Sequence, residues 1–451
     1  MLKRRIEGKI KEWIHHGKNA LLVSGARQVG KTYIIRECLN NENADFLEIN
    51  LINQYELIGV LNKSNNVDDL IFNLSVATGY TFKPGKSIVF IDEVQECKDI
   101  VTKVKFWVDD GRIKFVLSGS LLGIELNNLR SAPVGYLDEL EMYPLDFPEF
   151  LLASGITQDI LEKVKDKLLN AEPLLDETHQ ILLKHFKRYL LVGGMPAAVQ
   201  EYISSGDVNK VTDIQKNIIE QYKRDFTKYE SIDKKLFLED IYNLIPSELL
   251  KQNRRFMYSD LGKGLKFGRL ENSFLWHNAA GVVISVYNSS EPKIPLKINK
   301  QRNLFKLYYS DVGLLTSTYD NSTRLQLLSD EGTVNCGGIY ENAVIQQLNT
   351  HGLTPYYYNS KKLGELDIVI EYKGKILPIE VKSGKDYYLH SAISNVTGNK
   401  EFGINHSIVL SNYNYSADGD IEYYPIYMCA FIEDSTELPK LDPLSTIEVS
   451  K

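Results

Sequence analysis

The chain has 451 residues, of which 43% are hydrophobic and 25% charged, values that place it among folded globular proteins rather than disordered ones. Its 52 Lys and Arg residues are outnumbered by 59 Asp and Glu, and the net charge of −7 excludes a histone-like protein that binds nucleic acid by bulk charge. A chain of this length is expected to form about three domains.

Four cysteines lie far apart in the sequence and form no CxxC pair: Cys38, Cys97, Cys336 and Cys429. This usage indicates a reducing compartment and offers no zinc knuckle. The first residues are charged without an apolar core, unlike a signal peptide, and no apolar run reaches the roughly 18 residues of a membrane span. The expectation is a cytoplasmic protein with no membrane partner.

The first third of the chain alternates short apolar strands with helical segments. Helices are expected over 1–18 and 32–40, and strands over 20–26, 46–51, 87–94 and 114–120. Nearly continuous apolar strands separated by helices are typical of a parallel sheet covered on both faces. This α/β domain is expected to span residues 1–150 and to close near the two prolines of 144–150.

The rest of the chain is predicted to form three further units. Residues 151–235 are helical by period and form a lid, with a break at 193–196. Helices over 236–250, 257–265 and 269–281, followed by strands over 282–288 and 304–311, have the order of a winged-helix domain at 236–310. The last α/β domain, 311–451, has a helix over 338–352 and strands over 355–358, 366–372, 375–382 and 407–411.

Residues 25–32, GARQVGKT, match the phosphate-loop pattern GxxxxGK[ST] between a predicted strand and a predicted helix. The glycines let backbone N–H groups face a phosphate, Lys31 supplies positive charge to the β- and γ-phosphate oxygens, and the Thr32 hydroxyl ligates Mg²⁺. ATP with Mg²⁺ is therefore the expected ligand. The expected binding residues are Gly25, Ala26, Arg27, Gln28, Val29, Gly30, Lys31, Thr32 and Tyr33.

The apolar strand 88–91 ends in Asp92 and Glu93. Two carboxylates at the end of a buried strand need a cation, so Asp92 is expected to hold Mg²⁺ and Glu93 to deprotonate the attacking water. The strand over 114–120 ends in Ser118 and Ser120, which would lie beside the phosphates if this strand sits between the other two. Ser118 is then either a sensor of the γ-phosphate or an ordinary loop serine.

In their order, GARQVGKT, IVFIDEVQ, VLSGSLLGIELN, SAPVGYLDELEMYPLDFPEFL and YLLVGGMPAAV resemble the AAA+-like P-loop ATPases of bacteria and archaea that carry a C-terminal domain of unknown function. YKRDFTKYE, FKLYYSDVGLL and IYENAVIQQL extend the resemblance along nearly the whole chain. By this resemblance Gly194-Met195-Pro196 contacts the nucleotide from the lid; a plain helix break is the alternative. The resemblance also implies an arginine finger, with Arg27, Arg130, Arg188 and Arg224 as candidates.

Between 251 and 269, six cations accompany one acid, Asp260: Lys251, Arg254, Arg255, Lys263, Lys266 and Arg269. A recognition helix that begins near Arg269 would enter a major groove of DNA while the other cations contact phosphates. A spacer or a protein-binding surface is the alternative, because the fold alone does not decide the function.

Two late strands carry Asp367 and the Glu380-Val381-Lys382 triplet, in which the acid and the lysine share one strand face. With Glu341 on the preceding helix, they resemble the PD-(D/E)XK nuclease core, in which carboxylates bind Mg²⁺ and the lysine helps to activate water. Leu366 stands where that pattern has proline. The alternative is a Glu380–Lys382 ion pair without metal.

Two hypotheses follow. In the first, the chain is an ATPase in which Lys31, Glu93 and Ser118 are catalytic, and hydrolysis drives a conformational change in a winged-helix and nuclease-like part that acts on DNA. In the second, ATP controls a binding switch whose C-terminal part recognises a protein or nucleic acid without cutting it. Either form is compatible with a homo-oligomer or with transient self-assembly.

Overall fold

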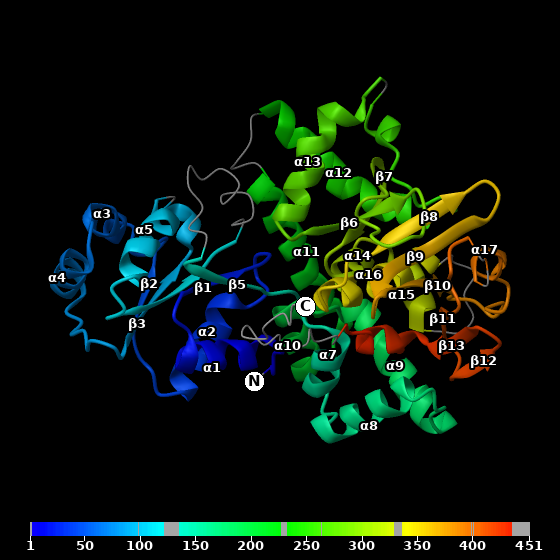
Figure 1. Cartoon of the computed structure of the whole chain (residues 1–451), viewed down its shortest axis with the longest axis horizontal. Coiled ribbons are helices and arrows are strands. Elements are labelled where there is room, and N and C mark those ends of the chain that lie inside the picture. Colours follow the sequence, from blue (N-terminus) through cyan, green and yellow to red (C-terminus); the bar gives the residue numbers. More distant parts are fainter. Residues whose placement is uncertain are drawn as a thin grey trace, which may run out of the picture.

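The computed structural model describes residues 2–97, 99–120, 135–226, 232–262, 264–328, 336–397, 399 and 401–434. Over these residues the chain forms a five-stranded sheet near its N-terminus and an eight-stranded sheet in its C-terminal half. The two sheets lie on opposite sides of the molecule in Figure 1. In the described part of the chain, no helix is both long and apolar enough to cross a membrane.

The N-terminal domain contains an all-parallel sheet with the strand order β2-β3-β4-β1-β5. Its elements are α1 (Ile6–His16), β1 (Ala20–Ser24), α2 (Lys31–Asn41), β2 (Asp45–Asn50), α3 (Glu56–Lys63), α4 (Val67–Thr78), β3 (Ser87–Asp92), the 3-10 turn η1 (Val94–Glu96), α5 (Ile100–Val108), β4 (Lys114–Ser118) and β5 (Leu137–Glu141). The predicted parallel sheet is confirmed. Strand β4 lies between β3 and β1, which is the condition that the prediction for Ser118 required.

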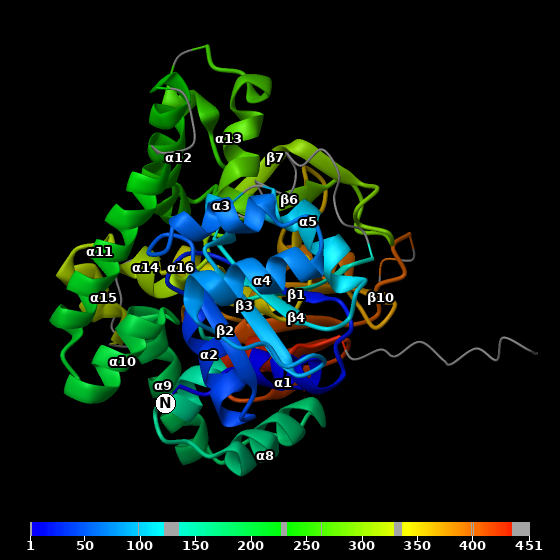
Figure 2. The ribbon, with the colours of Figure 1, turned by 90° about the vertical axis from the view of Figure 1, so that its left-hand side faces the viewer.

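Side chains of this sheet alternate between two apolar cores, as period-2 strands require. On β1, Leu21 and Val23 share a core with Ile34 of α2, whereas Leu22 shares the other core with Leu70 of α4 and Trp107 of α5. Figure 2 shows α1 and α2 on one face of the sheet and α3, α4 and α5 on the other. Because both faces are covered, only the strand ends remain available for polar chemistry.

The middle of the chain is helical, as predicted. Its helices are α7 (Phe147–Ala153), α8 (Gln158–Leu169), α9 (Asp176–Val192), α10 (Pro196–Ser205) and α11 (Val208–Phe226). The expected break is present, because α9 ends before Gly193, whose φ is 68°, and α10 begins at Pro196. Glycine tolerates that left-handed conformation, and proline at the first helical position loses no hydrogen bond.

The remaining elements form one mixed sheet with the strand order β12-β13-β11-β10-β9-β8-β6-β7 and the helices around it. They are α12 (Ile232–Leu250), η2 (Tyr258–Leu261), α13 (Phe267–Ala279), β6 (Val283–Ser289), β7 (Lys300–Tyr309), α14 (Val312–Ser317), α15 (Asn321–Leu328), α16 (Gly337–Thr350), β8 (Tyr356–Ser360), β9 (Gly364–Tyr372), β10 (Lys375–Val381), α17 (Ser391–Val396), β11 (Ser407–Ser411), β12 (Ser416–Asp418), β13 (Ile421–Pro425) and the 3-10 turn η3 (Ile426–Phe431).

The segment expected to be a separate winged helix differs from that prediction in two ways. Its second helix, expected over 257–265, is only the short turn η2, because positive φ angles at Gly262 and Gly264 end it. Its ribbon, β6 and β7, does not stand alone, since β6 pairs in parallel with β8 of the last unit. This pairing covers an edge of the β6–β7 ribbon that would otherwise be exposed. The domain boundary expected near residue 310 therefore does not divide the sheet.

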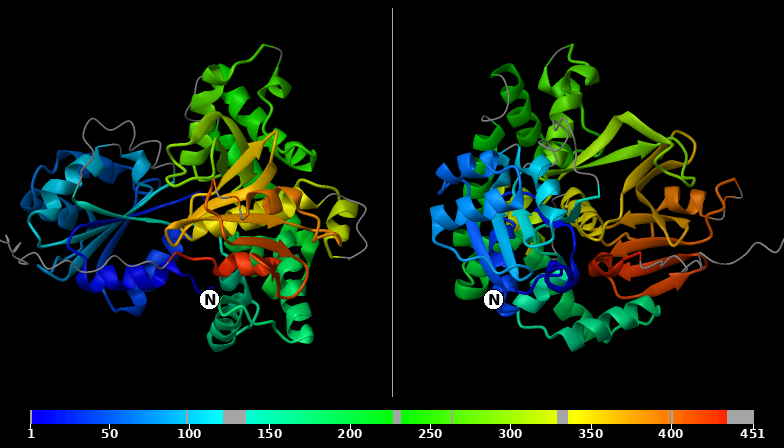
Figure 3. Two further views of the ribbon diagram at one scale, coloured as in Figure 1. Left: turned by 45° about the vertical axis from the view of Figure 1, so that its right-hand side comes forward. Right: turned by 60° about the vertical axis from the view of Figure 1, so that its left-hand side comes forward.

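Helix α16 is the centre of the C-terminal half. Every residue from Gly337 to Leu348 is buried. The helix contacts α9, α12, α14, β7, β10 and η3, and it is the yellow helix inside this half in Figure 3. A helix buried on all sides can hold polar side chains only where partners meet them, and α16 carries both Glu341 and Gln347.

His277 of α13 makes the stability of the protein depend on pH. Burial lowers its pKa to about 4, and Nε2 lies 2.9 Å from the carbonyl oxygen of Leu238. In the unfolded chain the imidazole takes up a proton near pH 6.5, whereas in the folded chain it stays neutral, so stability is lost as the pH falls below about 6.5.

Between pH 7 and pH 5, we expect this residue to reduce the free energy of unfolding by about 2 kcal/mol. The measurement is denaturant unfolding of the wild type and of His277→Gln, which keeps a donor toward Leu238, at both pH values. The variant should lose less stability on acidification. Equal losses in the two proteins would contradict the assignment.

Candidate nucleotide site and C-terminal acid cluster

The phosphate loop joins β1 to α2, and its shape depends on two glycines. Gly25 has φ 137°, and a Cβ placed on it would lie 2.2 Å from the carbonyl oxygen of Met142. Gly30 has φ 97° and precedes the first helical residue, Lys31. Other residues rarely adopt these angles. The first amides of α2 therefore lie in the loop without side-chain caps, as an anion-binding helix terminus requires.

Lys31 is buried at the centre of this loop. Its Nζ donates hydrogen bonds to the carbonyl oxygens of Gly25, at 2.9 Å, and Ala26, at 2.7 Å. Burial lowers the pKa of Lys31 to about 8, although the nearby carboxylates of Glu93 and Asp92 act in the opposite direction. The lysine thus has no side-chain partner within the loop that a phosphate would have to replace.

Asp92 collects three side-chain donors at the end of β3. Its Oδ2 accepts hydrogen bonds from Thr32 Oγ1, at 2.9 Å, and from Asn50 Nδ2, at 3.0 Å, and its Oδ1 accepts one from Ser118 Oγ. Thr32, Asp92 and Ser118 therefore meet where the sequence placed them. Asn50 was missed, although it ends β2 directly beside Asp92 in the parallel register.

Glu93 follows β3 in a left-handed backbone conformation, with φ 59° and ψ 44°. This conformation costs energy in a residue other than glycine, and such residues cluster at functional sites. Its carboxylate accepts a hydrogen bond from the Gln95 side chain, and its charge acts on Lys31. Glu93 is thus half-buried beside the phosphate loop, whereas Asp92 is buried.

Two residues of helix α11, Tyr222 and Asp225, contact the phosphate loop. The sequence analysis did not predict these contacts. The Arg27 guanidinium forms an ion pair with Asp225, and its Nε donates to Ser120 Oγ at 3.2 Å. The Tyr222 hydroxyl donates to the carbonyl oxygen of Arg27 at 2.9 Å. The first arginine-finger candidate is therefore paired within its own chain.

Of the other finger candidates, Arg188 and Arg224 lie within the described residues. Arg188 lies on α9, where it lines a cavity with Lys184 and His185. Arg224 is exposed on α11. Arg130 lies outside the described residues. So do the end of VLSGSLLGIELN and the start of SAPVGYLDELEMYPLDFPEFL, within 121–134, and residues 227–230 of YKRDFTKYE.

The Gly-Met-Pro element is both a helix break and a neighbour of the loop. A Cβ placed on Gly30 would lie 3.6 Å from Cγ of Pro196. Gly194 is fixed on both sides, because its carbonyl oxygen accepts from the amide of Leu145 at 2.7 Å and its own amide donates to Asp311 Oδ2 at 2.6 Å. Helices α9 and α10, the phosphate loop and the C-terminal half thus meet at this element.

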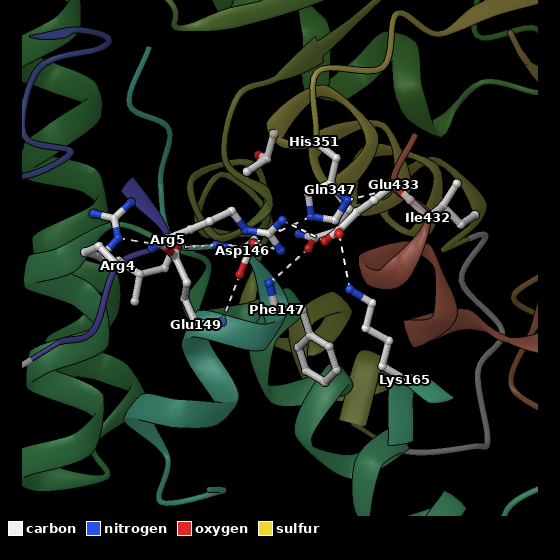
Figure 4. A network of polar contacts seen from close by, with 12 residues as sticks. Arg4, Arg5, Asp146, Phe147, Glu149, Lys165, Gln347, His351, Ile432 and Glu433 are labelled. Carbon is white, nitrogen blue, oxygen red and sulfur yellow. Dashed lines mark hydrogen bonds and ion pairs between the residues drawn. The ribbon is translucent and has the colours of Figure 1, made fainter. Parts of the chain in front are cut away.

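The N-terminal segment contacts the phosphate loop through Arg4, one of the residues labelled in Figure 4. Arg4 donates to the carbonyl oxygen of Val29 at 2.9 Å and to that of Tyr143 at 2.6 Å, and its Nε lies 3.3 Å from Glu149 Oε2. Sequence reasoning identified only a basic helix here. The signal was the arginine pair itself, at positions that precede the helix start at Ile6.

The same network reaches the C-terminal half (Figure 4). Arg5 lies 3.1 Å from Asp146 Oδ2 and contacts Glu433 at 2.6 Å, and His351, just after α16, lies 3.6 Å from the same Asp146 oxygen. Burial raises the pKa of Glu149 to about 7, and the charge of Asp146 acts in the same direction. A polar network therefore connects the N-terminal segment, which contacts the phosphate loop, to the end of α16.

Glu341 is fully buried on α16 and surrounded by donors. Its Oε1 lies 3.0 Å from Lys306 Nζ and accepts a hydrogen bond from the Tyr308 hydroxyl, and its Oε2 pairs with Arg254. Although burial alone raises the pKa of Glu341, the two cations lower it below its ordinary value. The carboxylate is ionised and paired.

The other predicted members of the C-terminal cluster lie beside it. Asp367 Oδ2 accepts a hydrogen bond from the amide of Val381 at 3.0 Å, and Lys382 Nζ lies 2.9 Å from Glu380 Oε1. Burial and the charge of Asp367 raise the pKa of Glu380 to about 8. The four predicted residues are thus close in space, but across the described chain no group of three His, Cys, Asp or Glu residues is arranged to hold a metal ion.

The basic segment predicted to face DNA is only partly available. Lys251 pairs with Asp260 at 2.6 Å, and Arg254 belongs to the acid cluster. Lys266 and Arg269 are exposed at the start of α13, and the Arg269 guanidinium lies 5.5 Å from the ring centre of Phe237. Lys263 lies outside the described residues.

Comparisons with known proteins assign the N-terminal part. A family model described as an AAA domain matches residues 17–151, and two models for domains of unknown function, DUF8612 and DUF4143, match residues 183–325 and 336–429. A search of curated proteins gave no match. Among solved structures, the chain is similar to the Walker-type ATPase PABY2304 of Pyrococcus abyssi, with 14% identity, coverage of 70% of this chain and 95% of that chain, and a TM-score of 0.43. Residues 17–151 therefore match an AAA domain and have its P-loop pattern at 25–32 on a parallel sheet.

Proposed function

We propose that the chain hydrolyses ATP at loop 25–32 and that the hydrolytic cycle changes the contacts between the AAA domain and the C-terminal half. The observation that carries this proposal is the convergence on Asp92. Thr32 Oγ1 at 2.9 Å and the Ser118 hydroxyl share that carboxylate at the first turn of α2. In P-loop NTPases the loop Ser or Thr and an Asp at the end of a neighbouring strand hold Mg²⁺, and these are the two residue types that meet here.

The residues present fit Mg·ATP. A hydroxyl and a carboxylate oxygen 2.9 Å apart form the hard oxygen pair that Mg²⁺ prefers, next to amides free to face phosphate. When bound, Mg²⁺ neutralises charge on the β- and γ-phosphate oxygens. With these groups bound, the Lys31 ammonium would face those oxygens, and Glu93 would orient the attacking water and accept its proton.

The contacts of the loop explain how a nucleotide state would reach the C-terminal half. Tyr222 and Asp225 hold Arg27 from α11, and a Cβ placed on Gly281, after α13, would lie 3.2 Å from the amide nitrogen of Ala26. A triphosphate that orders the loop amides must act on these contacts. The AAA domain and the helices that follow it are therefore mechanically linked in this proposal.

Ser118 distinguishes a γ-phosphate sensor from an ordinary loop serine. In Ser118→Ala, Asp92 loses one charged hydrogen bond, and we expect kcat to fall about ten- to a hundredfold with little change in the affinity for ADP. Phosphate release and ADP binding are measured in parallel. Ser120→Ala, which removes a partner of Arg27 instead, is the control. An unchanged kcat in Ser118→Ala supports the loop-serine alternative.

Action on DNA is the second candidate function, and the observation that favours it is the exposed pair Lys266 and Arg269 at the start of α13. We expect the full chain to bind duplex DNA with an affinity that falls steeply with salt, and Lys266→Glu with Arg269→Glu to weaken it about tenfold or more. Fluorescence anisotropy of labelled duplex measures both. The matched control is a charge reversal at Lys86, which is exposed on the AAA domain. Salt-independent binding, or equal loss in the control, would exclude this surface.

A further inference from the structure

The C-terminal acid cluster has the residue types of a metal site but not the free oxygens. Mg²⁺ is held through one or two carboxylates with near-octahedral oxygen geometry, and those carboxylate oxygens must be free to reach the ion. Both oxygens of Glu341 are occupied, by Lys306 at 3.0 Å with the Tyr308 hydroxyl, and by Arg254. Asp367 Oδ2 accepts the amide of Val381 at 3.0 Å, and its Oδ1 lies 3.8 Å from Arg254 Nη1.

Glu380 leaves a single oxygen without a partner. Its Oε1 pairs with Lys382 at 2.9 Å, whereas Oε2 is buried and has no hydrogen-bond partner among the described residues. Apart from this oxygen, Asp367 Oδ1 accepts no hydrogen bond among the described residues, and it faces the Arg254 guanidinium at 3.8 Å. The cluster is therefore a poor ligand set for Mg²⁺, which demands near-octahedral oxygen geometry. The residues therefore do not fit the metal that the nuclease-like pattern implies.

The two cations depend on the acids as much as the acids depend on them. The Lys306 side chain is 1% exposed on β7, and the Arg254 side chain, between α12 and η2, is 16% exposed. Burying such charges is costly unless they are paired. The guanidinium reaches both Glu341 on α16 and Asp367 on β9, so it occupies the space between the two acids that a bridging ion would take.

We propose that Arg254 and Lys306 supply, from within the chain, the positive charge that a divalent ion would supply in this cluster. The ion pairs of these acids then connect segment 236–310 to α16 and β9. In this proposal the C-terminal half does not cut phosphodiester bonds. This inference goes beyond ATP hydrolysis and is independent of it. It favours a C-terminal half that binds over one that cleaves.

The test is thermal unfolding of the full chain without nucleotide, with and without Mn²⁺. For the wild type and for the control Arg255→Met, we expect no Mn²⁺-dependent shift. Arg254→Met should unfold roughly 10 °C lower, because Glu341 loses a buried partner, and Mn²⁺ should restore part of that loss. No recovery with Mn²⁺ would contradict the idea that the arginine replaces a divalent ion.

Two further measurements keep the proposal testable if Arg254→Met does not fold. The double variant Arg254→Met with Glu341→Gln removes the charge on both partners and should unfold at a higher temperature than the single variant; a lower midpoint would overturn the pairing argument. The wild type alone also tests whether the cluster binds a metal ion. Mn²⁺-dependent stabilisation or plasmid nicking by the wild type that Glu380→Gln abolishes would show a working metal site and overturn the proposal.

Discussion

Lys31→Ala is expected to lower the rate of ATP hydrolysis at least ~100-fold, because the charge that meets the β- and γ-phosphate oxygens is lost. Lys31 is held at the centre of the loop by hydrogen bonds to the carbonyl oxygens of Gly25 and Ala26, and no carboxylate among the described residues is its hydrogen-bond partner. Its loss therefore leaves no buried carboxylate unpaired. Phosphate release under saturating Mg·ATP measures the effect, and ATP affinity should fall as well.

The matched control is Lys86→Ala, which removes an exposed lysine of the same domain and should hydrolyse ATP like the wild type. Denaturant unfolding of both variants separates a chemical effect from a folding defect. Hydrolysis by Lys31→Ala at the wild-type rate would place the active site elsewhere and would contradict the role given to the loop.

Glu93→Gln is expected to separate binding from chemistry. The amide keeps the size of the side chain but cannot accept a proton from water, so kcat should fall about 100- to 10,000-fold while Mg·ATP still binds. The side chain is half-buried and keeps its place at the end of β3 because the strained backbone is unchanged. Single-turnover hydrolysis and equilibrium ATP binding, measured on the same preparation, give both quantities.

Glu96→Gln is the control for this variant, since Glu96 is exposed three residues further along the chain. It should leave both quantities unchanged. If Glu93→Gln hydrolyses ATP normally, the general base is another residue. If it loses ATP binding to the same extent as turnover, Glu93 supports the loop rather than the water.

The residues predicted for the nucleotide site come together in the structure because its parts are local. The phosphate loop is contiguous, and the apolar strand before Asp92 fixes where that carboxylate emerges. The strand order β2-β3-β4-β1-β5 then brings Ser118 to the same edge. The continuous apolar strands predict a parallel sheet, whereas the strand order that connects these residues comes only from the structure.

The supports of that site were not predictable in the same way. Arg4 meets the loop from 25 residues before Val29, and Tyr222 and Asp225 meet it from more than 190 residues after Arg27. Such contacts depend on how separate helices pack. A lone arginine or tyrosine on a helix gives no signal of its partner.

The C-terminal cluster shows the same limit more sharply. Glu380, Lys382 and Asp367 lie close together, as the strand pattern led us to expect, because neighbouring strands and an alternating face are local features. The cations that neutralise the cluster come from 87 and 35 residues before Glu341. In the sequence Arg254 belongs to a basic segment that suggests DNA, and only the fold turns it inward.

The most direct test of the central claim is calorimetric titration of the purified full chain with Mg·ATP and with Mg·ADP. The account predicts one nucleotide bound per chain at sub-millimolar concentrations, with binding weakened when Mg²⁺ is removed and when Thr32 is replaced by alanine. Folded protein that takes up neither nucleotide at millimolar concentrations would contradict it.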